Sequence, residues 1–300
     1  MLGLPTFGMA LAITTVSAYL PVVASQFTSS APVIGVIIGG EGVMALWIPV
    51  IAGSWSDRLT TPIGRRLPFV VAGTPMMLVG LALMGAVNSL VAIALVVAIF
   101  FAGYFIAYEP YRALYPDIFG EEVAGRAQGN QAVWRGLGTG AALLAGGALL
   151  SVASFVPFAC AAVVLALANV AFAAILLRYG DPPRGERDLE APGIRDVAGR
   201  VKRLLSEHPA LRAYMAANAL WELAMGALKT FIVLYVTAGL GFALAQASLI
   251  IGGVAAIVLV GGLASGSSRI DSDGCGSCAP ASGSTGSRCS CLPSPRRRRC

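Results

Sequence analysis

Charged side chains are scarce in this sequence. Only 12% of its 300 residues are Asp, Glu, Lys or Arg, whereas an average soluble domain contains about a quarter. Apolar residues make up 57% of the chain, and the mean hydropathy is +0.77. Helices that are apolar on nearly every face have lipid rather than water as their solvent. The composition therefore excludes an ordinary soluble domain.

Residues that commonly catalyse reactions or bind metals are equally scarce. The sole histidine is His208, in a polar segment, and the sole cysteine before residue 264 is Cys160, in an apolar run. HExxH, GxSxG and phosphate-loop motifs are all missing from the sequence. We therefore expect no enzyme, no cofactor and no metal. A membrane-embedded transferase acting on lipid head groups would need a reactive cluster at one interface, which this sequence does not offer.

Long apolar runs are the main feature of the sequence. A run of about 20 apolar residues crosses about 30 Å of hydrocarbon as a helix, and eight such runs occur. This predicts an all-α polytopic membrane protein. The runs are 4–26, 32–54, 68–87, 90–111, 130–151, 154–177, 211–237 and 243–264.

Basic residues alternate between the connections of these runs. The first, third, fifth and seventh connections contain no Lys or Arg, and the even-numbered connections contain nearly all of them. Positively charged loops stay in the cytoplasm. We therefore expect a cell-membrane protein with both termini in the cytoplasm.

A polar segment at 179–209 separates six runs, in a half covering 1–178, from two more in 210–264. Its second part, IRDVAGRVKRLL, places Ile194, Val197 and Val201 on one helical stripe, with basic residues elsewhere. This pattern predicts an amphipathic helix on the cytoplasmic membrane surface.

The apolar pattern ends abruptly at Ala264. Residues 265–300 are rich in Ser, Gly, Cys and Arg and contain no aromatic residue, a composition that predicts disorder. Its CxxC and CxC elements resemble a zinc site only loosely, because their spacing fits no common module. We interpret the tail as frame-shifted sequence. Its cysteines are Cys275, Cys278, Cys289, Cys291 and Cys300.

A few charges fall inside the apolar runs, where charge is costly and usually lines a polar pathway. Glu41 lies near the middle of the second run. Glu109 and Arg112 are three residues apart in the fourth, and Glu222 and Lys229 are seven apart in the seventh. We expect all five on a substrate and cation pathway. The alternatives are a protonated, hydrogen-bonded Glu41 and structural ion pairs within each of the other two sets.

Glycines also recur at helical spacing. Gly136 and Gly140, like Gly35 and Gly39, form small faces that let helices approach closely. We expect them to serve packing rather than ligand binding.

Two loop motifs carry a family resemblance. GSWSDRLTTPIGRRLPF, at 53–69, resembles the loop after the second helix of the major facilitator superfamily. PYRALYPDIF, at 110–119, is similar to an element of the branch that contains sucrose transporters and glycoside–pentoside–hexuronide:cation symporters, although Pro116 replaces a usually small residue. The matching residues are Gly53, Asp57, Arg58, Gly64, Arg65 and Arg66, then Arg112, Ala113, Leu114 and Asp117.

The resemblance implies a role for the first loop. Asp57 would meet the N-terminus of a helix in the second half, where the helix dipole favours an anion, and the arginines would pair with Asp117. The loop would then act as a cytoplasmic gate. The alternative is a purely structural role, in which the loop is a water-facing turn and its basic residues only determine the membrane topology.

The resemblance also implies a fold and a function. It implies two six-helix halves with a solute site between them, of which this chain holds about 8 of 12 helices. We expect a secondary transporter in the lipid bilayer that moves a small solute, such as a sugar or glycoside, with H⁺ or Na⁺. We expect the 300-residue product to be C-terminally incomplete and inactive. The alternatives are an efflux antiporter of the same superfamily and a non-transporting sensor or scaffold. The excess of Lys and Arg over Asp and Glu lies mostly in the tail, so we expect no nucleic-acid partner.

Overall fold

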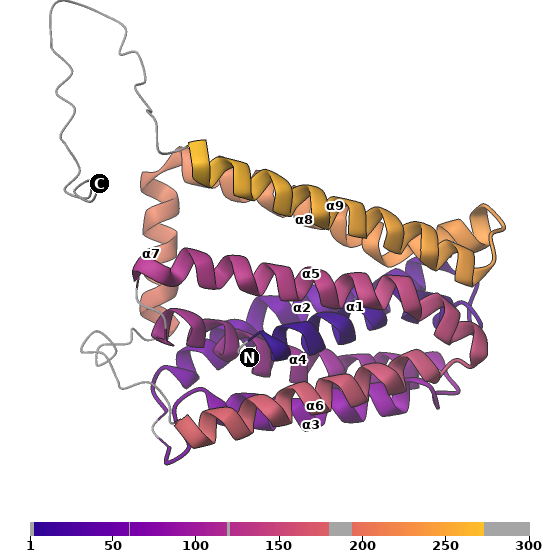
Figure 1. The fold of residues 1–300 in the computed structure, drawn as a ribbon, viewed down its shortest axis with the longest axis horizontal. Coiled ribbons are helices and arrows are strands. Elements are labelled where there is room, and N and C mark those ends of the chain that lie inside the picture. Colours follow the sequence, from indigo (N-terminus) through magenta and orange to yellow (C-terminus); the bar gives the residue numbers. More distant parts are fainter. Residues whose placement is uncertain (1–2, 60, 119–120, 180–193, 273–300) are drawn as a thin grey trace, which may run out of the picture. The chain divides into compact units, whose positions relative to one another are not determined.

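The computed structural model describes residues 3–59, 61–118, 121–179 and 194–272, and every one of its regular elements is a helix. This confirms the predicted all-α class. The chain divides into two compact units, Met1–Leu259 and Val260–Cys300. The helices below belong to the first unit, except for the end of α9. Figure 1 shows them coloured in order along the chain. Their bounds are α1 Leu4–Ala24, α2 Ala31–Ser56, α3 Leu67–Met84, α4 Leu90–Ile118, α5 Glu121–Val152, α6 Val156–Tyr179, α7 Ile194–Glu207, α8 Pro209–Leu234, the π-helical turn η2 Tyr235–Gly239 and α9 Leu244–Ser272.

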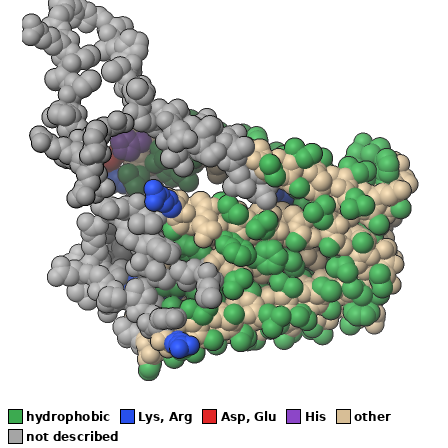
Figure 2. All heavy atoms as spheres, viewed as in Figure 1, with side chains coloured by type: hydrophobic (Ala, Val, Ile, Leu, Met, Phe, Trp, Pro, Cys, Tyr) green, Lys and Arg blue, Asp and Glu red, His purple; other side chains and the backbone are tan. Residues whose placement is uncertain are grey.

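Seven of the described helices are long and apolar enough to span a bilayer. They are α1 to α6 and the continuous α8–η2 segment, and they correspond to the first seven predicted runs. The eighth predicted run appears as a shorter apolar stretch, Leu244–Val258, at the start of α9. The chain is therefore an integral membrane protein, and its surface carries abundant apolar side chains (Figure 2).

Proline marks the start of several spans. A proline occupies one of the first two positions of α1, α2, α3 and α8. Proline is tolerated there because the first backbone N–H groups of a helix have no intrahelical acceptor.

One predicted boundary differs from the structure. Helix α9 continues to Ser272, beyond the predicted end of the apolar run at 264, and residues 273–300, with all five tail cysteines, lie outside the described residues. The predicted disorder and frame shift of the tail therefore stay predictions for 273–300. Helix α7 lies in the segment for which the sequence predicts an amphipathic helix, and its place on a membrane surface also stays a prediction.

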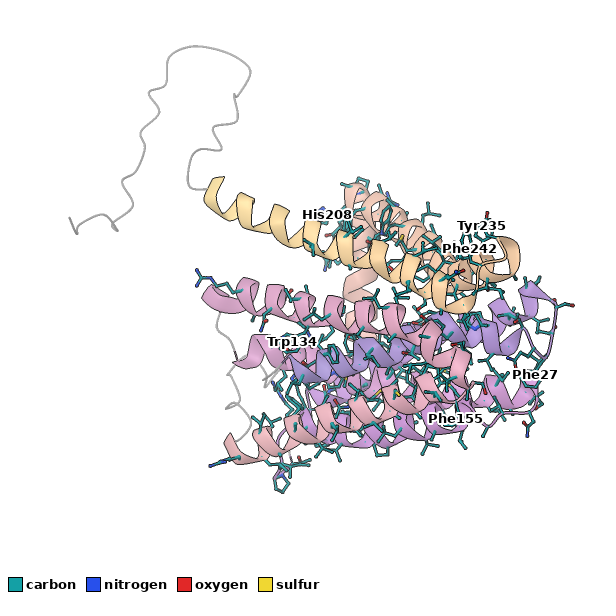
Figure 3. The ribbon with its side chains drawn as sticks, turned by 45° about the vertical axis from the view of Figure 1, so that its right-hand side comes forward. Phe27, Trp134, Phe155, His208, Tyr235 and Phe242 are labelled. Carbon is teal, nitrogen blue, oxygen red and sulfur yellow. The ribbon has the colours of Figure 1, made fainter. Side chains whose placement is uncertain are left out.

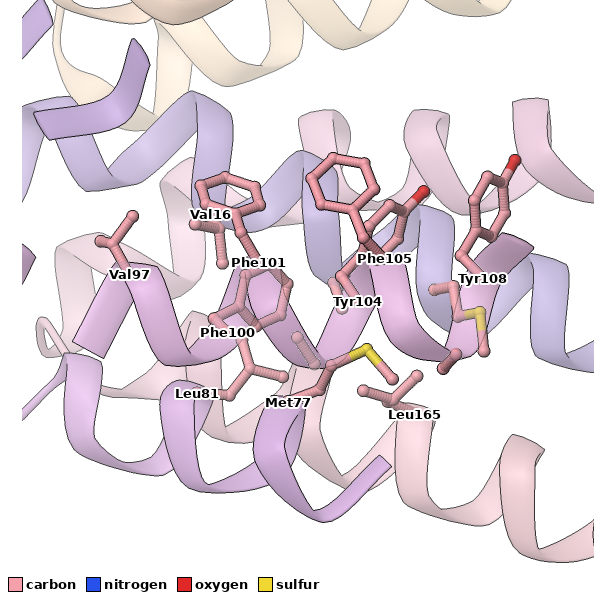
Figure 4. Packing of buried hydrophobic residues seen from close by; sticks show 14 of the residues in the cluster. Val16, Met77, Leu81, Val97, Phe100, Phe101, Tyr104, Phe105, Tyr108 and Leu165 are labelled. Carbon is pink, nitrogen blue, oxygen red and sulfur yellow. The ribbon is translucent and has the colours of Figure 1, made fainter. Parts of the chain in front are cut away.

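The core of the first unit is built where α3 and α4 meet. Phe100 is fully buried and packs beside Leu81 and Met77 of α3 (Figure 4). Glycine allows the close approach: a Cβ on Gly73 would lie 2.4 Å from the Gly103 carbonyl oxygen. Without a hydrophobic driving force between helices in lipid, such close contact between small residues supplies much of the association.

Of the four glycines predicted to serve packing, Gly39 and Gly140 make no close contact with another helix. An added Cβ would meet nothing within 4 Å at Gly39 or Gly140, and only the Phe231 ring, at 3.4 Å, at Gly35. In α5 the close contacts occur at Gly138, against the Phe7 carbonyl of α1, and at Gly146, against the Tyr19 ring. The small-residue spacing identified α5 as a packing helix but selected Gly140 wrongly, because spacing alone does not say where the neighbouring helices lie.

Polar groups in the core are joined across helices. The Tyr111 hydroxyl of α4 lies 2.7 Å from Thr6 Oγ1 of α1 and 2.9 Å from the Tyr115 hydroxyl. Tyr111 is fully buried, so these bonds compensate for the removal of its hydroxyl from water.

A Tyr111→Phe substitution tests this network. It should lower stability by about 1 kcal/mol, because Thr6 loses its buried partner. Thermal denaturation in detergent measures the change, with Tyr214→Phe as the control, since Tyr214 is 68% exposed. Equal denaturation temperatures for the two variants would contradict the prediction.

Candidate functional site

Helix α4 presents a polar, aromatic face along one side. Tyr104 and Tyr108 are one turn apart, and their rings stack with centroids 4.9 Å apart. Both project away from Leu81 and Met77 of α3 (Figure 4). Farther along, Glu109 Oε1 lies 3.8 Å from a terminal guanidinium nitrogen of Arg112. The ion pair that was the alternative to a pathway role is therefore formed, on the same helix as a stack of tyrosines, and the pathway role stays a prediction.

Helix α5 adds a second guanidinium to this face. The guanidinium carbon of Arg135 lies 5.7 Å from the Tyr108 ring centroid, and that of Arg112 lies 5.6 Å from it. A cation within about 6 Å of an aromatic centroid is attracted by the ring quadrupole. Tyr108 is thus held by two arginines from two helices, which fixes the orientation of its ring.

Glu41 joins three further helices. Its half-buried side chain, on α2, interacts with the hydroxyl of Ser17 on α1 and, through charge, with Lys229 on α8. Glu41 also lies within electrostatic reach of Tyr104. A carboxylate, an ammonium group and a tyrosine face therefore converge from α2, α8 and α4.

The pathway role of the five predicted residues stays a prediction, and the structure shows which of them lie near one another. Glu41, Glu109, Arg112 and Lys229 belong to the cluster just described. Glu222 is exposed on α8 and forms no ion pair with Lys229 within 4.0 Å, so the structure supports no pairing along one face of that helix. Lys229 instead faces Glu41 across helices.

Sequence reasoning missed two members of the cluster, Arg135 and Tyr108. Arg135 lies inside the predicted run 130–151, so the cost of an intramembrane charge was an available signal. Tyr108 gave no such signal, because an aromatic residue in an apolar run is ordinary.

The loop between α2 and α3 is a compact, charged turn. Arg66 Nη2 lies 3.4 Å from Asp57 Oδ1, and the Arg66 side chain is buried, with 8% exposure. Gly64 has φ of 101°, a left-handed conformation that favours glycine. The Thr61 hydroxyl donates to the Gly64 carbonyl and closes the turn.

The predicted gate residues lie in or beside this turn, and their role as a gate stays a prediction. Asp57 contacts Arg66 of its own loop in this structure, whereas the resemblance implied the N-terminus of a second-half helix. Arg58 and Arg65 belong to the same loop, and Gly53 lies in the last turn of α2, which ends at Ser56. The side chain of Asp117 lies outside the described residues, so its predicted pairing with the arginines stays a prediction.

An apolar cavity of about 460 Å³ lies beside this loop. Trp55 and Phe69, whose rings meet edge to face at 5.7 Å, form part of its wall with Ile48, Ile51 and Leu59. Its lining contains none of the charged residues of the α4 and α5 face. The polar cluster and this cavity are therefore separate features.

No group of three or more His, Cys, Asp or Glu side chains in the described ranges is arranged to hold a metal ion. The candidate site is instead a set of paired opposite charges around aromatic rings. Guanidinium, carboxylate and phenol groups supply hydrogen-bond donors and acceptors to polar molecules.

Comparison with known proteins agrees with this fold. No curated protein matches the sequence. A solved structure described as a bacterial homologue of the human lysosomal transporter Spinster, inward-facing and unoccupied, is similar with a TM-score of 0.66 and 16% sequence identity. The match covers 87% of this chain and 59% of that one. At this identity the likeness establishes the fold alone.

The family follows from the sequence match. The model of the Major Facilitator Superfamily matches residues 2–272, which contain every described helix. The chain therefore belongs to the Major Facilitator Superfamily of membrane transporters.

Proposed function

We propose that the protein is part of a secondary transporter that moves a small polar solute, such as a sugar or glycoside, together with H⁺ or Na⁺. The observation that carries the proposal is the cluster of Glu109, Arg112 and Arg135 around Tyr108. Guanidinium and carboxylate groups offer hydrogen-bond donors and acceptors to hydroxyls, and an aromatic face packs against the apolar side of a sugar ring.

Coupling is assigned to Glu41. A carboxylate that is half-buried at membrane depth is costly to leave charged, which favours uptake of a proton or a cation, whereas Lys229 and Ser17 stabilise its charged form when that proton or cation leaves. Binding of the cation changes the charge beside Tyr104, and this joins the cation position to the solute position.

The loop of Asp57, Arg58, Gly64, Arg65 and Arg66 is assigned to a gate at the cytoplasmic side, in the cell membrane, with both termini in the cytoplasm. Exposed ion pairs contribute only about 0–1 kcal/mol each. A few breakable pairs bias a two-state equilibrium without locking it.

Solute binding tests the proposal. The purified chain, in detergent, is offered radiolabelled sucrose, a phenyl glycoside and an amphipathic cation, with and without Na⁺ and at two pH values. We expect saturable binding of a sugar or glycoside. Binding of the amphipathic cation alone would instead support an efflux antiporter, and binding of no probe would contradict the proposed solute class.

A Glu41→Gln variant tests the coupling. It should bind solute with less than about a threefold dependence on Na⁺ or pH, where the parent chain shows about tenfold, because the amide cannot titrate or hold a cation. Glu207→Gln, at an exposed helix end, is the control. Unchanged ion dependence in Glu41→Gln would remove Glu41 from the mechanism. Concentrative uptake into vesicles by the 300-residue chain would show the expectation of an inactive product to be wrong.

A further inference from the structure

A second polar cluster joins α1, α5 and α9, at the opposite end of these helices from the Asp57 loop. The Tyr19 hydroxyl of α1 donates to the Leu143 carbonyl of α5 at 3.0 Å and lies 3.0 Å from Ser248 Oγ of α9. Both Tyr19 and Ser248 are buried, with 0% and 1% exposure. The Phe27, Phe155 and Phe242 side chains mark the same end (Figure 3).

Ser248 is bound to α5 as both a donor and an acceptor. Its hydroxyl oxygen accepts the Gly147 N–H at 3.0 Å, and the hydroxyl contacts the Leu143 carbonyl oxygen. With the Leu144 carbonyl at 3.2 Å, a single serine therefore contacts three backbone groups of α5 and a tyrosine of α1. Hydrogen bonds between helices in lipid are individually modest, but several on one residue act together.

Two glycines bring the backbones close enough for these bonds. A Cβ on Gly147 would lie 2.3 Å from Ser248 Cβ and 2.5 Å from the Leu244 carbonyl oxygen. A Cβ on Gly252, one turn farther along α9, would lie 2.7 Å from Leu144 side-chain atoms. Any side chain at either position would force α9 away from α5.

We propose that Tyr19, Gly147, Ser248 and Gly252, called the α5–α9 clasp, hold the first six helices and α9 together at this end and so determine which side of the transporter is closed. The role in alternating access rests on the proposed function, because only a transporter needs the two ends to open in turn. The clasp itself is a property of packing and can be measured without any solute.

Distance measurements between spin labels test the clasp. Labels are attached to cysteines introduced at Val152, at the end of α5, and at Leu240, just before α9. Both positions are exposed, at 76% and 54%. Cys160 and the five tail cysteines are replaced by serine in this background. We expect one short distance to dominate in the parent chain.

Gly147→Ala should shift the ratio of short to long distances by about tenfold or more toward the long one, because its Cβ has no space. Gly140→Ala is the matched control on the same helix, since a Cβ there meets nothing within 4 Å. Identical distance distributions for the two variants would overturn the proposal.

A second pair of variants keeps the test valid if Gly147→Ala fails to fold. Ser248→Ala removes the bridging hydroxyl without adding bulk and should give a shift in the same direction of about threefold or more. Ser151→Ala is its control, since the exposed Ser151 hydroxyl bonds only to its own helix, at the Ala148 carbonyl. No shift in Ser248→Ala would overturn the clasp.

The two proposals fail separately. Distances that shift as expected in a chain that binds no solute leave the clasp intact and contradict the proposed function. If the chain binds solute but the distances do not shift in the variants, the clasp is contradicted and the proposed function stands.

Discussion

An Arg135→Ala variant should bind the sugar or glycoside at least about tenfold more weakly than the parent chain. A hydrogen bond from a charged group contributes about 1.5–3 kcal/mol, and each 1.4 kcal/mol is a factor of ten in affinity. The loss also frees Tyr108, whose ring Arg135 approaches to 5.7 Å. Radioligand binding in detergent measures the effect.

Two further variants make this prediction specific. Arg178→Ala, at the exposed end of α6, should bind as the parent does. Arg135→Lys keeps the charge but loses the planar fork, and should recover only part of the affinity. Full affinity in Arg135→Ala would remove this residue from the solute site and leave Arg112 as the site's guanidinium.

A Gly73→Leu variant should fail to give monodisperse protein. A Cβ at Gly73 would lie 2.4 Å from the Gly103 carbonyl oxygen and 2.8 Å from Ala107 Cβ. Backbone cannot move aside as a flexible side chain can, so α3 and α4 must separate. Overpacking of a core typically costs about 1–3 kcal/mol, and a full leucine against backbone lies at or above the top of that range.

Size-exclusion profiles and denaturation temperatures in detergent measure this loss. Gly42→Leu is the matched control, because Gly42 is also inside a spanning helix and a Cβ there meets nothing within 4 Å. Gly73→Ala should fall between the two. Similar profiles for Gly73→Leu and Gly42→Leu would show that α3 and α4 do not pack through this contact.

The spans were predictable because the signal for a membrane helix is local. The bounds of α2, Ala31–Ser56, follow from one apolar run bounded by Ser30 and Asp57, and no other part of the chain is needed to read them. The end of α9 was not predictable in this way, because GSSRIDS in 266–272 is polar and carries no apolar period.

The candidate site was predictable only as separate charges. The cost of placing Glu41, Arg112 or Lys229 in lipid is a property of each residue, so each could be singled out from its position in an apolar run. The choice of partner is not local. The alternative considered for Lys229 was a pair with Glu222 on its own helix, but in the structure Lys229 interacts through charge with Glu41 of α2.

The sequence by itself determined that the chain crosses a membrane as helices and resembles transporters of this type. Hydropathy and short loop motifs depend only on residues that are close together in the sequence. The tertiary structure alone decided which side chains meet: Arg135 with Tyr108, Asp57 with Arg66, and Ser248 with Gly147. The physical reason is that lipid fixes where a helix begins and ends, whereas contacts between helices depend on the rotation and separation of both partners. The rotation and separation of two helices depend on small residues such as Gly147, and the contacts of such a residue come from a different helix.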